Sequence, residues 1–320
     1  MTLHPDIGAF LDLAEERQAG SQATFATMTA QQARAAFELT THQLRWPAPE
    51  AVDVQALEAR GRDGAAIALR LYRPHGASAG PQGLVCYLHG GGYVVGSLDS
   101  HDGVCRELCQ RSGFPVLSVG YRLAPEHKFP TALHDCTDTL HWLREQAVPL
   151  GIDLERVVLA GDSVGASLAT VLAIEAAHAG EAAPITPCLQ VLCYPMTDAS
   201  QRSASMELFA EGYLLESDTL EWFYQHYART AQDRLDWRFS PLLADDLRGV
   251  APAVVVVAGF DPLLDEGLAY ARKLQAQGVD VQLLEYPDLT HDLLRMRSVV
   301  PAVEQVHETL AGLIRQRLQR

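Results

Sequence analysis

The segment Gly161-Asp162-Ser163-Val164-Gly165 places a serine in a pattern that is typical of a catalytic nucleophile. It follows the apolar run 157–160 and opens a helix-like run over residues 164–179. This order predicts a nucleophile elbow, a sharp turn that exposes the serine at the end of a sheet. The flanking glycines permit close backbone approach in such a turn. Since GxSxG also arises by chance, the strand and helix around it carry most of the prediction that Ser163 is a nucleophile.

A serine hydroxyl is a weak nucleophile and needs a general base, which is usually held by an acid. In the order serine, acid, histidine, Asp261 follows the apolar run 253–260 and His291 follows the run 281–287. Both side chains are expected just beyond the carboxyl ends of strands, where sites form in open sheets. The sequence therefore predicts a catalytic triad of Ser163, Asp261 and His291.

Other interpretations of these residues stay open. Asp261 also fits a helix N-cap, because Pro262 follows it, and His291 also fits a histidine of a surface loop. Three other carboxylates compete for the acid role: Asp265, Glu266 and Asp288. Three histidines that precede the serine are expected to be structural: His127, His134 and His141.

The run His89-Gly90-Gly91-Gly92-Tyr93 follows the apolar stretch 84–88. Its glycines leave backbone N–H groups bare, and the N–H groups of Gly91, Gly92 and Val164 are the expected donors of an oxyanion hole. Losing one such donor typically costs about 2.7–4 kcal/mol of transition-state stabilisation. A phosphate loop or a plain turn is the alternative, although no Gly-Lys-Ser/Thr follows. His89 is expected to brace the loop rather than transfer protons.

Short apolar runs alternate with helix-like segments along most of the chain. The strand candidates are 52–56, 66–73, 84–89, 115–121, 156–161, 189–195, 253–259 and 281–287, and the first two flank a turn at 61–64. The helix candidates are 100–112, 131–147, 164–179, 265–278 and 300–318. This alternation predicts an α/β fold with an eight-stranded, mostly parallel sheet and helices on both faces.

Two regions break the alternation. Residues 1–46 are rich in Ala and Gln with helical spacing, and residues 198–240 hold no strand-like run but many aromatic residues. The second region is expected to form two or three helices over the sheet. Four side chains are candidate liners of a substrate pocket, although each also fits ordinary core packing: Tyr93, Phe209, Tyr213 and Leu214.

Composition narrows the function further. With 25 Lys and Arg against 40 Asp and Glu, the net charge is −15, which disfavours nucleic acids and anionic membranes as partners. The first residues lack a basic start, and no run of about 18 apolar residues occurs, so neither a signal peptide nor a membrane span is expected. The six cysteines contain no CxxC, which predicts free thiols in a reducing cytoplasm and no metal site.

Five segments resemble the hormone-sensitive-lipase family of α/β-hydrolase esterases, over about residues 80–295. They are HGGGY at 89–93, YRLAPEHKFP at 121–130, GDSVG at 161–165, FDPLLDEG at 260–267 and the segment around His291. The resemblance implies an α/β-hydrolase fold with a helical cap, acting on a small-molecule ester without a metal or organic cofactor. It assigns residues 1–46 and 198–240 to the cap, and residues 47–197 and 241–320 to the catalytic core.

Other charged residues are expected to have structural roles, and family analogy suggests a dimer. Arg122 and Glu126 are expected to brace the loop under the site, and Asp135 and Asp138 are interpreted in the same way. Pairing of the edge strand near 281–286 with a second copy would form a homodimer.

Two positions depart from the family. Val164 stands where Ala is usual, which narrows the oxyanion corner, and Asp292 stands where Gly follows the histidine. A carboxylate beside His291 is expected to raise its pKa or to reorient it.

The predicted function is hydrolysis of short- to medium-chain acyl esters through an acyl-enzyme. An amidase or acyltransferase with the same triad is the alternative, and a non-catalytic receptor is disfavoured because all three triad residues are present.

Overall fold

The computed structural model describes residues 2–18, 25–76 and 80–319, with the side chains of 14–18 excepted. Residues 1, 19–24, 77–79 and 320 of the predicted segments lie outside the described residues. The strands are β1 (Val52–Arg60), β2 (Ala66–Pro74), β3 (Gln82–Leu88), β4 (Val116–Gly120), β5 (Ile152–Asp162), β6 (Leu189–Cys193), β7 (Ala253–Phe260) and β8 (Val281–Thr290). The α-helices are α1 (Pro5–Gln18), α2 (Ala30–Leu44), α3 (Asp102–Ser112), α4 (Thr131–Leu150), α5 (Val164–Ala179), α6 (Ala204–Leu208), α7 (Ser217–Tyr227), α8 (Leu264–Ala276) and α9 (Val303–Leu318).

The strands form one sheet in the order β1-β2-β4-β3-β5-β6-β7-β8. The β2 strand runs antiparallel to both of its neighbours, and every pair from β4 to β8 is parallel. This confirms the predicted eight-stranded, mostly parallel sheet. The β7 strand is buried almost throughout, as its apolar run predicts, whereas the edge strand β8 is half-buried or exposed up to its two buried final residues, Leu289 and Thr290.

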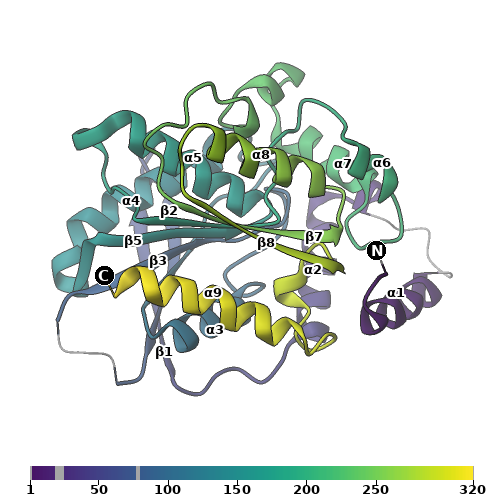
Figure 1. Ribbon diagram of the computed structural model, residues 1–320, viewed down its shortest axis with the longest axis horizontal. Coiled ribbons are helices and arrows are strands. Elements are labelled where there is room, and N and C mark those ends of the chain that lie inside the picture. Colours follow the sequence, from purple (N-terminus) through teal and green to yellow (C-terminus); the bar gives the residue numbers. More distant parts are fainter. Residues whose placement is uncertain (1, 19–24, 77–79, 320) are drawn as a thin grey trace.

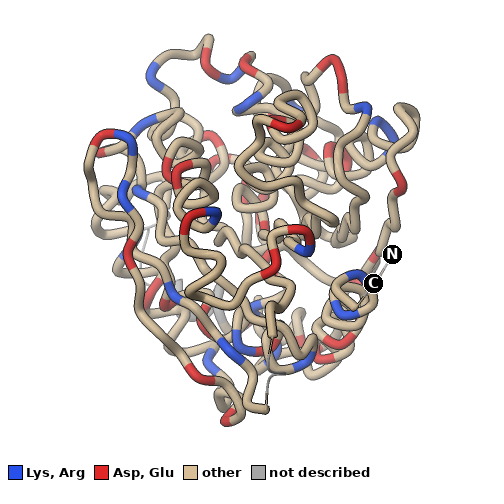
Figure 2. Tube along the Cα trace, turned by 90° about the vertical axis from the view of Figure 1, so that its left-hand side faces the viewer, with Lys and Arg blue, Asp and Glu red and all other residues tan. Residues whose placement is uncertain are grey.

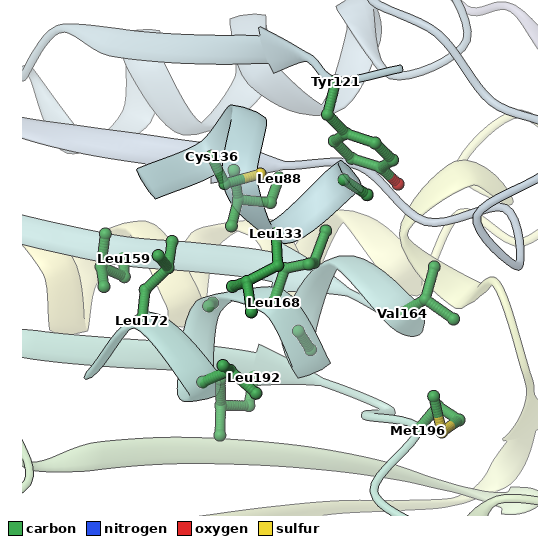
Figure 3. Packing of buried hydrophobic residues seen from close by; sticks show 14 of the residues in the cluster. Leu88, Tyr121, Leu133, Cys136, Leu159, Val164, Leu168, Leu172, Leu192 and Met196 are labelled. Carbon is green, nitrogen blue, oxygen red and sulfur yellow. The ribbon is translucent and has the colours of Figure 1, made fainter. Parts of the chain in front are cut away.

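Helices cover both faces of the sheet. Figure 1 shows α3 and α9 below the sheet and α4, α5 and α8 above it, and two separate hydrophobic clusters fill these layers. Figure 3 shows Leu159 of β5 and Leu192 of β6 beside Leu168 and Leu172 of α5. This dense packing under α5 holds the start of that helix in place, and the start of α5 is where Ser163 lies.

Element boundaries differ from the predictions in places. The β5 strand begins at Ile152, earlier than the apolar run 156–161, because Ile152 pairs with Gln82 across an irregularity in the β3–β5 ladder. The α4 helix continues to Leu150 and ends at Gly151, whose φ of 62° forms a left-handed C-cap.

The two segments predicted to form a cap meet at one end of the sheet. Figure 1 shows α2, α6 and α7 at the end toward which the arrows of β7 and β8 point. Thr29 and Gln32 form a capping box that begins α2, and α6, α7 and a 3-10 turn (Ala231–Leu235) form the second segment. The two parts touch where the rings of Phe25 and Phe223 lie 6.2 Å apart. The boundaries between cap and core remain a prediction.

Charged residues are spread along the whole described trace. Figure 2 shows Asp and Glu interspersed with Lys and Arg rather than gathered on one element. Within the described ranges, no helix combines the length and the hydropathy that a membrane span requires.

Candidate active site

Ser163 occupies the turn between β5 and α5. Its φ of 53° and ψ of −122° lie outside the regions that most residues adopt, as expected for a strained nucleophile elbow. The turn is tight enough that a side chain at Gly165 would collide with the carbonyl oxygen of Leu88. The Ser163 N–H donates to the carbonyl of Cys193 at 2.9 Å, which fixes the turn to the end of β6. The hydroxyl is therefore held at the carboxyl edge of the sheet.

The three residues of the predicted triad form one hydrogen-bonded chain. The Ser163 hydroxyl lies 3.0 Å from His291 Nε2, and His291 Nδ1 lies 2.8 Å from Asp261 Oδ2. His291 directly follows β8 and Asp261 directly follows β7, so the parallel pairing of these strands places both loops at one edge. All three side chains are buried, which shields the hydrogen bonds between them from water.

Burial and charge act in opposite directions on the histidine. Burial lowers the pKa of His291, but the charge of Asp261 and its hydrogen bond, together with Asp292 and Asp162, outweigh burial and raise the pKa above its usual value. The ring of Tyr194 packs edge-on against the His291 ring, with centroids 4.7 Å apart. The imidazole is thus held by Asp261 through its Nδ1 atom and by packing against the ring of Tyr194.

The glycine loop after β3 presents backbone donors beside Ser163. Gly91 and Gly92 have φ values of 112° and 60°, and a side chain at Gly92 would collide with the ring of Phe223. Neither N–H donates to another group in the described part of the chain. The N–H of Val164 is at the first turn of α5 and has no partner within the helix. The structure brings these three predicted donors to the cavity around Ser163.

A buried network that the sequence analysis missed supports this loop. The carboxylate of Asp162 accepts hydrogen bonds from the Tyr87 hydroxyl at 2.6 Å and from the Gly90 N–H at 3.1 Å, and His101 Nε2 lies 3.2 Å from it. Burial raises the pKa of Asp162, but His101 and Tyr87 outweigh burial and lower it to about 2. Asp162 thereby ties the nucleophile turn to the glycine loop. No sequence motif marked His101, because it reaches Asp162 only through tertiary packing.

His89 has the bracing geometry that was predicted. Its Nδ1 lies 2.7 Å from the carbonyl oxygen of Gly90, and its own carbonyl accepts a hydrogen bond from the Tyr121 hydroxyl at 2.6 Å. Burial, with a smaller contribution from His101, lowers the pKa of His89 to about 3, so the ring is neutral at neutral pH.

A cavity of about 90 Å³ lies over Ser163. It is lined by Phe25, Phe37, Gly91, Gly92, Ser163, Val164, Leu214, Leu215, Thr219, Leu220, Phe223, Tyr224, His291 and Asp292. Of the four predicted liners, Leu214 borders this cavity, and Tyr93, Phe209 and Tyr213 do not. Tyr93 is fully buried and stacks on Tyr227 at 3.8 Å, in the core.

Phe209 and Tyr213 pack at the end of β7 and do not line the cavity. Their rings lie 5.6 Å and 5.4 Å from the ring of Phe260 at the end of β7, where they anchor the insertion to the sheet. Aromatic content predicts burial but not direction, and the aromatic liners are instead Phe223 and Tyr224 of α7 with two residues of the N-terminal segment.

Two of the three competing acids, Asp265 and Glu266, have other partners. Asp265 accepts a hydrogen bond from the Ser205 N–H, and Glu266 accepts from the N–H groups of Thr197 and Asp198. Burial raises the pKa of Glu266 to about 8. The N-cap interpretation of Asp261 is wrong in detail, because α8 begins at Leu264 after Leu263.

Asp261 nevertheless accepts from the Leu263 N–H at 2.8 Å, so the turn before α8 helps to orient its carboxylate.

The predicted bracing residues also have partners. Arg122 pairs with Asp135, and Glu126 pairs with Arg34 of α2, which joins the core loop to the cap. Asp138 pairs with Arg62.

The chain is similar to a known protein family and to several known ester hydrolases. A model of the alpha/beta hydrolase fold family matches residues 85–295. An ethyl acetate hydrolase of Pseudomonas putida is 48% identical over 307 residues, which cover 95% of this chain and 96% of that protein. The carboxylic ester hydrolase LipN of Mycobacterium tuberculosis is 44% identical over 255 residues, which cover 78% of this chain and 67% of that protein.

A solved structure of an ester hydrolase from the metagenome of Lake Arreo, bound to a bipyridine phosphonate derivative, superposes with a TM-score of 0.95. The two sequences are 34% identical, and the match covers 100% of both chains. The chain belongs to the hormone-sensitive-lipase-like family of α/β-hydrolases. It is a carboxylic ester hydrolase of the serine type.

Proposed function

We propose that the protein hydrolyses esters in two steps through an acyl-enzyme on Ser163. His291 takes the hydroxyl proton as the serine oxygen attacks the ester carbonyl, and it gives that proton to the departing alcohol. Asp261 holds the imidazole in the tautomer that accepts at Nε2 and stabilises the imidazolium. Water, activated by His291, then hydrolyses the acyl-enzyme.

The negative oxygen of the tetrahedral intermediate needs donors that are in place before the reaction. We assign this role to the N–H groups of Gly91, Gly92 and Val164. The free Gly91 and Gly92 donors and the support of their loop by Asp162 favour this assignment. The observation that carries the proposal most is the pair of short contacts from Ser163 to His291 and from His291 to Asp261.

We propose short to medium acyl chains as the substrates. The cavity over Ser163 is small, about 90 Å³, and residues of the two predicted cap segments line it, which favours a short acyl chain over a long one. Its lining is mostly apolar, which suits an alkyl chain. We expect esters of C4 to C6 acids to react faster than esters of C12 or longer acids.

The nucleophile assignment is tested with Ser163→Ala on 4-nitrophenyl butyrate. Removing a triad nucleophile leaves only the residual effect of binding and the oxyanion donors, so we expect kcat to fall by about 10⁴-fold or more. Circular dichroism and thermal unfolding of the same sample establish that the variant is folded. A folded variant that keeps most of the parent activity would remove Ser163 from the mechanism.

Two further expectations stand as proposals. All six cysteines are free thiols, which favours a reducing cytoplasm as the location.

The strand β8 is at the edge of the sheet, so we propose that its free edge pairs with a second copy to form a homodimer. Sedimentation equilibrium at the mass of one chain, 34.9 kDa, would contradict the dimer.

A further inference from the structure

Asp292 is held in an unusual backbone conformation beside the base. Its φ of 66° and ψ of 15° lie in the left-handed region, where glycine is the least strained residue and Asp is tolerated. The residue directly follows His291 and lines the cavity over Ser163. The chain therefore keeps a carboxylate, with some backbone strain, at a point where that charge acts on the catalytic base.

Arg295 is the partner of this carboxylate. Its Nη1 lies 2.6 Å from Asp292 Oδ2, and its side chain is 4% exposed, so it is the one buried arginine among those whose side chains are described. A buried guanidinium is costly unless its charge is compensated and its N–H groups are bonded. Asp292 compensates the charge here, and hydrogen bonds from Nη1 and Nη2 hold the guanidinium, so we treat the pair as a single electrostatic unit.

The same guanidinium reaches the cap. Its Nη2 donates to Thr41 Oγ1 at 2.6 Å, and its central carbon lies 4.1 Å from the ring centroid of Phe37. Phe37 and Thr41 both belong to α2, and Phe37 also lines the catalytic cavity. One side chain thus joins the loop that carries His291 to the helix that closes the pocket.

We propose that Asp292 and Arg295 form a positioning unit for His291: Arg295 fastens the His291 loop to α2 and cancels the negative charge that Asp292 places beside the imidazole. The proposal rests on the proposed role of His291 as the base. Neither residue touches the reacting atoms in this assignment, and both act through His291.

Several charged or titratable groups face His291 from the surrounding elements. They are Asp261 after β7, Asp162 at the end of β5, Tyr194 after β6, and Asp292 with Arg295 on its own loop. Asp292 raises the pKa of His291. Without Arg295 its charge would be uncompensated and the pKa would rise further; without Asp292 the guanidinium would be unpaired and the pKa would fall.

The experiment measures kcat/KM against pH for four proteins on 4-nitrophenyl butyrate: the parent, Asp292→Asn, Arg295→Met and the double variant. Because the neutral imidazole is the active form, activity is lost below the pKa of His291. We expect the acidic limb to move down by at least about 0.5 pH units in Asp292→Asn and up by a similar amount in Arg295→Met. In the double variant it should return to within about 0.2 pH units of the parent.

Thr41→Val serves as the matched control, because it removes the bond between α2 and the guanidinium without changing a charge. The acidic limb of its kcat/KM profile should lie at the same pH as that of the parent. If Arg295→Met does not fold, Asp292→Asn and the double variant decide the question alone. A limb that is unchanged in Asp292→Asn, or that moves in the same direction in both single variants, would overturn the proposal. If the proposal is overturned in this way while Ser163→Ala has lost its activity, the proposed function still stands.

Discussion

The cavity over Ser163 has two walls of opposite character. The core wall consists of Gly91, Gly92, Ser163, Val164, His291 and Asp292, which belong to loops at strand ends or to a helix start. The cap wall consists of Phe25, Phe37, Leu214, Leu215, Thr219, Leu220, Phe223 and Tyr224. Side chains of the core wall have directed hydrogen bonds, such as the 2.8 Å contact from His291 to Asp261, whereas the cap wall is mostly apolar.

This difference separates rate from substrate choice. Hydrogen bonds and backbone donors stabilise charge only at one geometry, so a change in the core wall should lower the rate for every ester. Apolar contacts have little directionality, so a change in the cap wall should alter which acyl chain fits. The comparison fails if core variants change selectivity or if cap variants lower all rates equally.

After Ser163→Ala, the largest effect is expected for Asp261→Asn, which acts on the core wall through His291. The amide cannot hold His291 in the tautomer that accepts the serine proton, and kcat should fall by about 10³- to 10⁴-fold for all chain lengths. Asp265→Asn is the matched control, because Asp265 bonds the Ser205 N–H and not His291. It should stay within about threefold of the parent. Equal losses in the two variants would show that Asp261 has no special role.

A smaller loss is expected for Gly92→Ala. The added methyl group would meet the Phe223 ring at a residue with a φ of 60°, which displaces an oxyanion donor and should lower kcat about 10²- to 10³-fold. Gly113→Ala is the control, since Gly113 has a φ of 77° with open space around it at the end of α3. The account would be wrong about this loop if Gly92→Ala matched the control in kcat.

The smallest effect is expected in the cap wall. Phe223→Ala enlarges the cavity and should raise kcat/KM for a C8 ester relative to a C4 ester by about tenfold. Phe209→Ala deletes an equally buried ring that packs on Phe260 and does not line the cavity, so its chain-length profile should match the parent. A parental series of 4-nitrophenyl esters that peaks at C12 or longer would contradict the proposed substrate range.

The same contrast explains what could be predicted from the sequence. The sheet and the loops that carry Ser163, Asp261 and His291 follow from local patterns, because each residue comes at most a few positions after an apolar run. His101, Tyr194 and Arg295 leave no such pattern, because their contacts with Asp162, His291 and Asp292 form only when distant elements pack.

The cap was predicted least well. An aromatic-rich segment predicts burial but not which neighbours each ring packs against. Tyr93, Phe209 and Tyr213 pack against other rings and do not line the cavity, while Phe223 and Tyr224 border it. The start of α8 was also predicted imprecisely. By sequence, Pro262 fits the first position of a helix, but the helix begins at Leu264.

The central claim is that the Ser163 hydroxyl is the atom activated by His291 and Asp261. Labelling the folded protein with a 4-nitrophenyl alkylphosphonate, followed by peptide mass spectrometry, tests it most directly. The account predicts one phosphonyl group per chain, on the peptide that contains Ser163, with labelling slowed at least about 10³-fold in His291→Ala. A protein that is active on 4-nitrophenyl butyrate but carries the label on another residue, or that labels equally fast without His291, would contradict it.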